Sequence, residues 1–224
     1  DAEKAKNCIF DTDIIPGEPL RIAFDYNANI NAMVIGQTPT RANTATLKIL
    51  NSMLVKNGRK LEALCTDFCK YYAPHQGSCN EVIFYMDSTA KQGGSYASEH
   101  AEDTKFYNIV KRVLNKYGWK VTIVDMGRPM AHNQKFEFLN GCLAGTQKPL
   151  LRFNIENNER TLIQAMDLTM VKQTAKGFAK YKDTEKLKNL DNDELGEVAS
   201  QSGITDITDA FDTLVIGVRF HNVS

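Results

Sequence analysis

Three aspartates that adjoin apolar runs are the residues best suited to chemistry. Asp25 closes the run RIAFD, Asp87 follows VIFYM, and Asp209 opens the C-terminal stretch DAFDTLVIGV. A carboxylate beside such a run is poorly solvated, and its charge is costly unless it is paired or holds a cation. Carboxylate oxygens are ligands that Mg²⁺ and Mn²⁺ take. The three acids therefore predict a metal site built from distant parts of the chain.

The chemistry typical of such a site is phosphodiester hydrolysis. Two divalent ions about 3.5 to 4 Å apart stabilise both the attacking and the leaving oxygen of a phosphodiester. Each acid also has a structural interpretation: Asp25 as a turn residue, Asp87 as a turn or helix-capping residue, and Asp209 as a first-turn acid that complements the helix dipole. The metal hypothesis depends on whether the fold brings the three together.

Other acids are weaker candidates for the same site. Asp206 and Asp212 lie three residues on either side of Asp209. Asp206 could be a helix cap, and Asp212 could join Asp209 or face solvent. Asp125 also ends a strand-like run, but we expect it on an outer strand, farther from Asp25.

The order of the elements that must position these acids predicts the fold class. Three strands in an antiparallel meander are followed by helix, strand, helix, strand, and a strand–helix–strand unit forms a right-handed parallel crossover. This is the order of an α/β fold, the RNase H-like mixed five-stranded sheet flanked by helices, in which the first and fourth strands are neighbours. An inserted hairpin and helix region is expected before the C-terminal helix. The strands are expected at residues 21–25, 32–36, 44–55, 82–86 and 119–124, and the helices at 61–72, 106–117, 136–143 and 206–218.

Length and composition set the remaining bounds. The 224 residues suit one domain, expected at 20–224, after a lead-in segment or linker at 1–19; because the chain starts with Asp rather than Met, we expect a piece of a longer protein. Lys and Arg balance Asp and Glu at 27 each, so no global positive field marks a nucleic-acid partner, although a local basic patch can exist. No run reaches the roughly 18 to 20 apolar residues of a membrane span, and no signal peptide is visible.

The cysteines indicate a reducing, cytosolic setting rather than a disulfide framework, because five is an odd number in a long chain. Cys65, Cys69 and Cys79 could suggest zinc. Cys65 and Cys69 also fall on the apolar face of an expected helix, and structural zinc takes four ligands at closer spacing, so we favour the core interpretation.

A run of lysines is the clearest local charge pattern. Six lysines lie between residues 171 and 189, where they could contact DNA phosphates or form a solvated face. The four histidines (His75, His100, His132 and His221) lack the spacing of metal ligands and are assigned no chemistry, and no P-loop motif is present. The candidate DNA-binding residues are Lys172, Lys176, Lys180 and Lys182.

Taken together, the segments FDYNANINAMVIGQ, VIFYMDSTA and TDITDAFDTLVIG resemble the C-terminal nuclease domain of the large terminase subunit of tailed bacteriophages. The resemblance runs from about residue 20 to 219. It implies a DNA-packaging protein whose RNase H-like endonuclease cuts concatemeric double-stranded DNA with two Mg²⁺ or Mn²⁺ ions. It also implies an ATPase domain N-terminal in the full-length chain, a portal and a small terminase subunit as partners, and the cytoplasm of an infected bacterial host.

The resemblance also assigns roles to residues. Asp25, Asp87 and Asp209 match the catalytic metal ligands, with Asp25 bridging both ions and water as the nucleophile. Asp206 falls where relatives carry His or Asp. The lysine-rich segment resembles a hairpin near the active site. Two alternatives stay open: another RNase H-like nuclease, such as a junction resolvase or an RNase H, and a non-catalytic DNA-binding or assembly module.

Overall fold

The main sheet carries the predicted arrangement of strands. The computed structural model describes residues 8–9, 14–26, 30–56, 60–92, 105–169, 171–174, 177–180 and 204–221. Within these ranges the sheet has seven strands in the order β1-β7-β4-β3-β2-β5-β6. They are β1 (Cys8–Ile9), β2 (Leu20–Tyr26), β3 (Asn31–Gln37), β4 (Thr46–Val55), β5 (Glu81–Met86), β6 (Lys120–Asp125) and β7 (Leu150–Asn154).

The strand directions confirm the RNase H-like fold. β2, β3 and β4 form an antiparallel meander, whereas β5 pairs with β2, and β6 with β5, in parallel. The first and fourth predicted strands, β2 and β5, are therefore neighbours, as expected.

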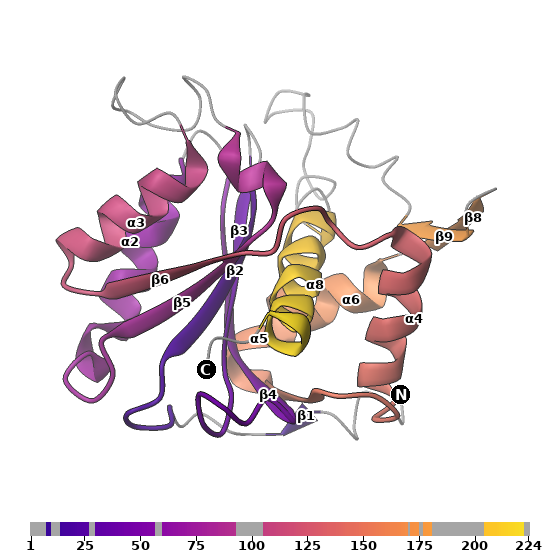
Figure 1. The fold of residues 1–224 in the computed structure, drawn as a ribbon, viewed down its shortest axis with the longest axis horizontal. Helices are drawn as coiled ribbons and strands as arrows, with labels where there is room; N and C mark the ends of the chain where they lie inside the picture. Colours follow the sequence, from indigo (N-terminus) through magenta and orange to yellow (C-terminus); the bar gives the residue numbers. More distant parts are fainter. Residues whose placement is uncertain are drawn as a thin grey trace.

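Helices cover both faces of the sheet (Figure 1). On one face lie α2 (Leu61–Tyr72) and α3 (Phe106–Lys116). On the other lie α4 (His132–Leu143), α5 (Ile155–Asn158), a π-helical turn (Glu159–Ile163), α6 (Gln164–Leu168) and α8 (Ile204–Phe220). A hairpin of β8 (Val171–Thr174) and β9 (Gly177–Lys180) precedes α8.

The alternation of side chains along β2 explains the two cores. Ile22 and Phe24 face the apolar cluster under α2 and α3, whereas Ala23 belongs to the cluster under α8. Ala23 and Ala32 are small and fully buried, which lets α8 pack closely across β2 and β3. The sequence of α8 is mostly apolar because one side of it covers the sheet and its neighbours cover much of the rest.

The structure differs from the sequence-based expectation at several points, and the main sheet has seven strands rather than five. β7 was expected to lie in an insertion, but it joins the main sheet by parallel pairing with β4. Residues 8–9, within the predicted lead-in segment, pair with β7. The last helix begins at Ile204, so Asp209 lies in its second turn and does not open it.

Candidate active site

Asp25 and Asp87 lie at the carboxyl ends of adjacent parallel strands. Ala23 of β2 pairs with Tyr85 of β5; Asp25 lies two residues after Ala23 on β2, and Asp87 lies two residues after Tyr85, directly after β5 ends. The two carboxylates therefore leave the sheet at the same edge. This is the proximity that the strand order predicted.

Asp87 also caps the short 3₁₀ turn η2 (Ser88–Lys91). Its Oδ1 accepts hydrogen bonds from the Thr89 backbone N–H at 2.8 Å and from the Thr89 hydroxyl at 2.5 Å. The capping interpretation of Asp87 is therefore correct for this oxygen. The turn fixes the carboxyl group at the strand end.

α8 contributes two further carboxylates to the same place. Asp25, Asp87, Asp209 and Asp212 all line one cleft of about 560 Å³. The Asp209 side chain is 19% exposed and that of Asp212 only 5%, so the residue ranked lower from sequence is the deeper of the two. Asp206 is buried at 2% exposure and is not among the described residues that line the cleft.

Two lysines that come from other elements hold Asp209 and Asp212. Lys135 Nζ of α4 lies 2.9 Å from Asp212 Oδ2 and 3.6 Å from Asp209 Oδ1. Lys180 Nζ of β9 lies 2.6 Å from Asp212 Oδ2 and 2.8 Å from Asp209 Oδ1, and it donates a hydrogen bond to Thr208 Oγ1 at 3.0 Å. Two ammonium groups therefore compensate two poorly solvated carboxylates.

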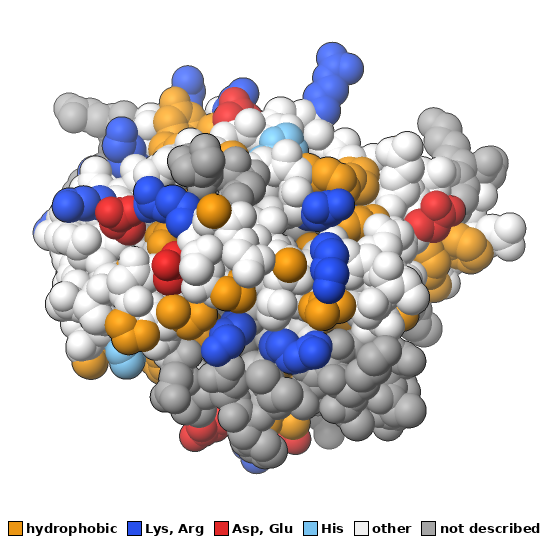
Figure 2. Space-filling view, turned by 60° about the horizontal axis from the view of Figure 1, so that its bottom comes forward, with side chains coloured by type: hydrophobic (Ala, Val, Ile, Leu, Met, Phe, Trp, Pro, Cys, Tyr) orange, Lys and Arg blue, Asp and Glu red, His pale blue; other side chains and the backbone are white. Residues whose placement is uncertain are grey.

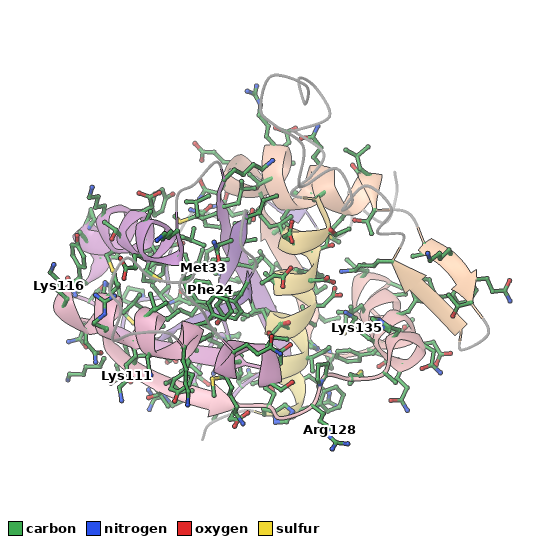
Figure 3. The ribbon with its side chains drawn as sticks, turned by 90° about the horizontal axis from the view of Figure 1, so that it is seen from above. Phe24, Met33, Lys111, Lys116, Arg128 and Lys135 are labelled. Atoms are coloured by element: carbon green, nitrogen blue, oxygen red, sulfur yellow. The ribbon has the colours of Figure 1, made fainter. Side chains whose placement is uncertain are left out.

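Lys135 was missed from the sequence. In Figure 3 it lies on α4, on the side that faces α8. The apolar pattern predicted this helix only from residue 136, one residue after Lys135, so the lysine was not placed on it. Lys135 lies three residues after His132 and four residues before Leu139. In a helix this spacing places the three residues on one side, and this was the signal in the sequence.

Further basic side chains stand along the cleft. Arg128, His132 and His221 line it, although the histidines had been assigned no chemistry. His132 begins α4 and His221 follows α8, so the fold brings them to one cleft from distant parts of the chain, which a rule of spacing along one helix does not detect. Arg128 lies on the loop before α4, towards the edge of the molecule in Figure 3.

The four lysines expected to bind DNA have different positions. Lys180 reaches the acidic cluster, and Lys172 is exposed on β8. Lys176 and Lys182 lie outside the described residues. Figure 2 shows another face of the molecule, where Lys and Arg side chains gather near the middle, so local basic areas exist despite the balanced net charge.

Asp125 does not share the cleft. It lies on β6, which pairs with β5 and not with β2. Its Oδ2 forms an ion pair with Lys91 Nζ at 2.6 Å, and its Oδ1 accepts from the Gly127 N–H at 3.0 Å. The hydrogen bond from Lys91, and then that from Gly127, lower the pKa of Asp125. It is a matched strand-end acid outside the candidate site.

The cleft carboxylates suit a divalent cation by their donor chemistry. They supply oxygen ligands, and Asp209 and Asp212 already bind positive charge in the form of two ammonium groups. Among the residues with described positions, no three His, Cys, Asp or Glu side chains form a group compact enough for a metal ion. The ligand set is thus present in kind but is not gathered around a single point.

Comparisons with known proteins identify the fold. No protein-family model matches the chain, and no curated protein matches it significantly in sequence. The large terminase of a thermophilic bacteriophage superimposes with a TM-score of 0.54 and 12% identity, covering 97% of this chain and 44% of that one. The manganese-soaked human cytomegalovirus terminase nuclease domain superimposes with a TM-score of 0.51 and 10% identity, covering 99% and 96%. This chain has the terminase nuclease fold.

The terminase fold accounts for almost the whole chain. The match to the cytomegalovirus nuclease domain covers 96% of that structure. It covers 44% of the length of the thermophilic bacteriophage terminase. In the ranges that the structure describes, no helix combines the length and apolar character of a membrane span.

Proposed function

We propose that this chain is the nuclease part of a viral terminase, a divalent-metal-dependent endonuclease that hydrolyses double-stranded DNA. The observation that carries the proposal is the meeting of four carboxylates from β2, β5 and α8 in one cleft. The terminase nuclease fold and the manganese used with the cytomegalovirus domain support it.

Asp25, Asp87 and Asp209 would hold two Mg²⁺ or Mn²⁺ ions, with Asp212 as an additional carboxylate beside Asp209. Divalent metal there supplies charge neutralisation at the phosphate and a lowered pKa for the attacking water. No protein nucleophile is required. Asp206 is buried outside the cleft. Its role would be to maintain the structure of α8 rather than to bind metal.

The chain's own cations then position the substrate. Arg128 and His132 line the cleft beside the carboxylates, where they can donate to phosphate oxygens on either side of the scissile bond. Lys172, which is exposed on the neighbouring hairpin, would add a further phosphate contact, whereas Lys180 of the same hairpin is held by Asp209 and Asp212. Phosphate contacts fix the position of a duplex without reading its sequence.

The larger assembly follows from the terminase resemblance. The full-length protein would carry an ATPase domain N-terminal to this chain and would cut concatemeric DNA into genome lengths. It would work with a portal and a small terminase subunit in the cytoplasm of an infected bacterium.

Cleavage of supercoiled plasmid tests the proposal. With Mn²⁺ or Mg²⁺ we expect nicked and linear products, none in EDTA, and loss of cutting in Asp25→Ala and Asp209→Ala. Asp125→Ala is the matched control, because it removes a strand-end acid outside the cleft and should cut like wild type.

The two alternative functions predict different results when other substrates are also tested. A junction resolvase or an RNase H would prefer four-way junctions or RNA–DNA hybrids to linear duplex. A non-catalytic DNA-binding or assembly module would give no cutting with any divalent ion.

A further inference from the structure

A second, smaller pocket adjoins the acidic cleft. It has a volume of about 160 Å³ and lies between α4, α6, the β8–β9 hairpin and α8. It shares three lining residues with the cleft, His132, Lys135 and Asp212, so the two hollows meet at the acidic cluster. Most of the other lining is apolar and comes from Phe136, Leu139, Leu143, Met166, Val171, Phe178 and Phe211.

Aromatic rings form one wall of this pocket. Phe136 of α4 and Phe178 of β9 stack with ring centroids 5.0 Å apart and planes 30° from parallel. Phe178 is still 43% exposed, which is unusual for a phenylalanine that already has a stacking partner. A planar group that enters the pocket can therefore contact an aromatic ring.

Charge at the mouth indicates what kind of planar group this is. Lys135 and Lys180 line the pocket and also bind Asp209 and Asp212 in the acidic cluster. Because these lysines are already paired with carboxylates, the anionic part of a ligand that spans both hollows would lie in the cleft, which Arg128 also lines, and its flat, apolar part would lie against the rings. Asn140 and Thr169 add polar atoms to the lining, which suits a flat group with a polar edge.

From this arrangement, and resting on the proposed nuclease function, we propose that the pocket receives one unstacked nucleobase of the DNA strand bound at the cleft. The pocket is small, about 160 Å³, so we propose one base rather than a larger group. Enzymes that extrude a base hold it between apolar or aromatic side chains, and stacking on an aromatic ring tolerates any base. The double-stranded substrate would then be unstacked locally, at the base that enters the pocket.

Binding of a fluorescent single-stranded oligonucleotide in Ca²⁺, compared with the same strand carrying abasic sites, tests the pocket without requiring cleavage. The two strands have the same phosphates and differ in their bases. We expect wild type to bind the intact strand about tenfold more tightly, and Phe178→Ala to lose that preference while binding the abasic strand as before. Phe178→Tyr should keep it, because the ring remains. Tyr117→Ala, which removes an exposed ring at the end of α3, should also keep it.

The proposal would be overturned if wild type bound the two strands with equal affinity. It would also be overturned if Phe178→Ala lowered the affinity for both strands equally. A loss of preference in Tyr117→Ala as large as in Phe178→Ala would also overturn it. Because no cutting is measured, these outcomes are separate from the plasmid assay. If the chain cuts plasmid but binds both strands equally, only the proposal that the pocket receives a base is refuted. If the chain does not cut but keeps its preference for the intact strand, only the proposed nuclease function is refuted.

Discussion

Gly217 of α8 packs directly on the ring of Tyr85 in β5, so that a Cβ at position 217 would lie 2.5 Å from Tyr85 Cγ. Tyr85 is fully buried and precedes Asp87 by two residues. On its other side, the buried Arg21 of β2 donates a hydrogen bond to the Tyr85 hydroxyl. The missing side chain at 217 therefore sets how closely the helix that carries Asp209 approaches the strand that leads to Asp87.

Replacing Gly217 with alanine should destabilise the protein and reduce cleavage together. Alanine favours a helix by about 1 kcal/mol over glycine, but overpacking in a core costs about 1–3 kcal/mol, and the clash is with ring atoms next to the backbone. We expect a net loss of up to about 2 kcal/mol in urea unfolding, with slower plasmid cutting. Gly77→Ala is the control, since a Cβ there meets nothing within 4 Å. Wild-type stability and cutting in Gly217→Ala would show that this contact does not set the helix position.

Lys135 should compete with metal for the acidic cluster. Its ammonium lies 2.9 Å from Asp212 Oδ2 and offsets charge that a divalent cation would otherwise meet. In Lys135→Met we expect calorimetry to show that Mn²⁺ binds about three- to tenfold more tightly than to wild type. This corresponds to a binding free energy more favourable by roughly 1 kcal/mol, because the lysine no longer competes with the metal. Lys116→Met removes an exposed lysine on α3, away from α8 in Figure 3, and should leave Mn²⁺ binding unchanged. Weaker Mn²⁺ binding in Lys135→Met would instead mean that this lysine positions the carboxylates.

The buried thiols should be unreactive in the folded protein. Burial raises the pKa of Cys69 to about 12 and that of Cys142 to about 11. At about pH 8, below the ordinary thiol pKa, we expect slow labelling by Ellman's reagent in native buffer and fast labelling in urea. Fast native labelling of both would contradict the core interpretation of the cysteines.

The same thiols give a pH dependence of stability. Their folded pKa values exceed the ordinary value of 9.0, so their contribution to stability is full below about pH 9 and decreases as the pH rises towards 11 and 12. The urea midpoint should fall in that interval. Replacing Cys142 with alanine should make the fall shallower, and an unchanged slope would argue against the raised pKa.

The convergence of Asp25 and Asp87 could be predicted from sequence because it depends on strand order and on one parallel crossover. The place of β7 could not, since its pairing with β4 joins residues about a hundred positions apart and leaves no local pattern. The burial of the Asp212 side chain could not be predicted from the sequence either. Its spacing from Asp209 puts the two on one side of α8, but only the packing of α4 and β9 shows that this side is covered.

The most direct test of the central claim, that the cleft carboxylates support metal-dependent DNA hydrolysis, is the single-turnover rate of plasmid cleavage in Mn²⁺ for Asp25→Asn against Asp125→Asn. Both changes remove one charge from a strand-end acid with almost no change in shape, and only Asp25 lines the cleft. We expect Asp125→Asn to cleave at the wild-type rate and Asp25→Asn to cleave at least about a hundredfold more slowly. Equal rates in the two variants would contradict the claim.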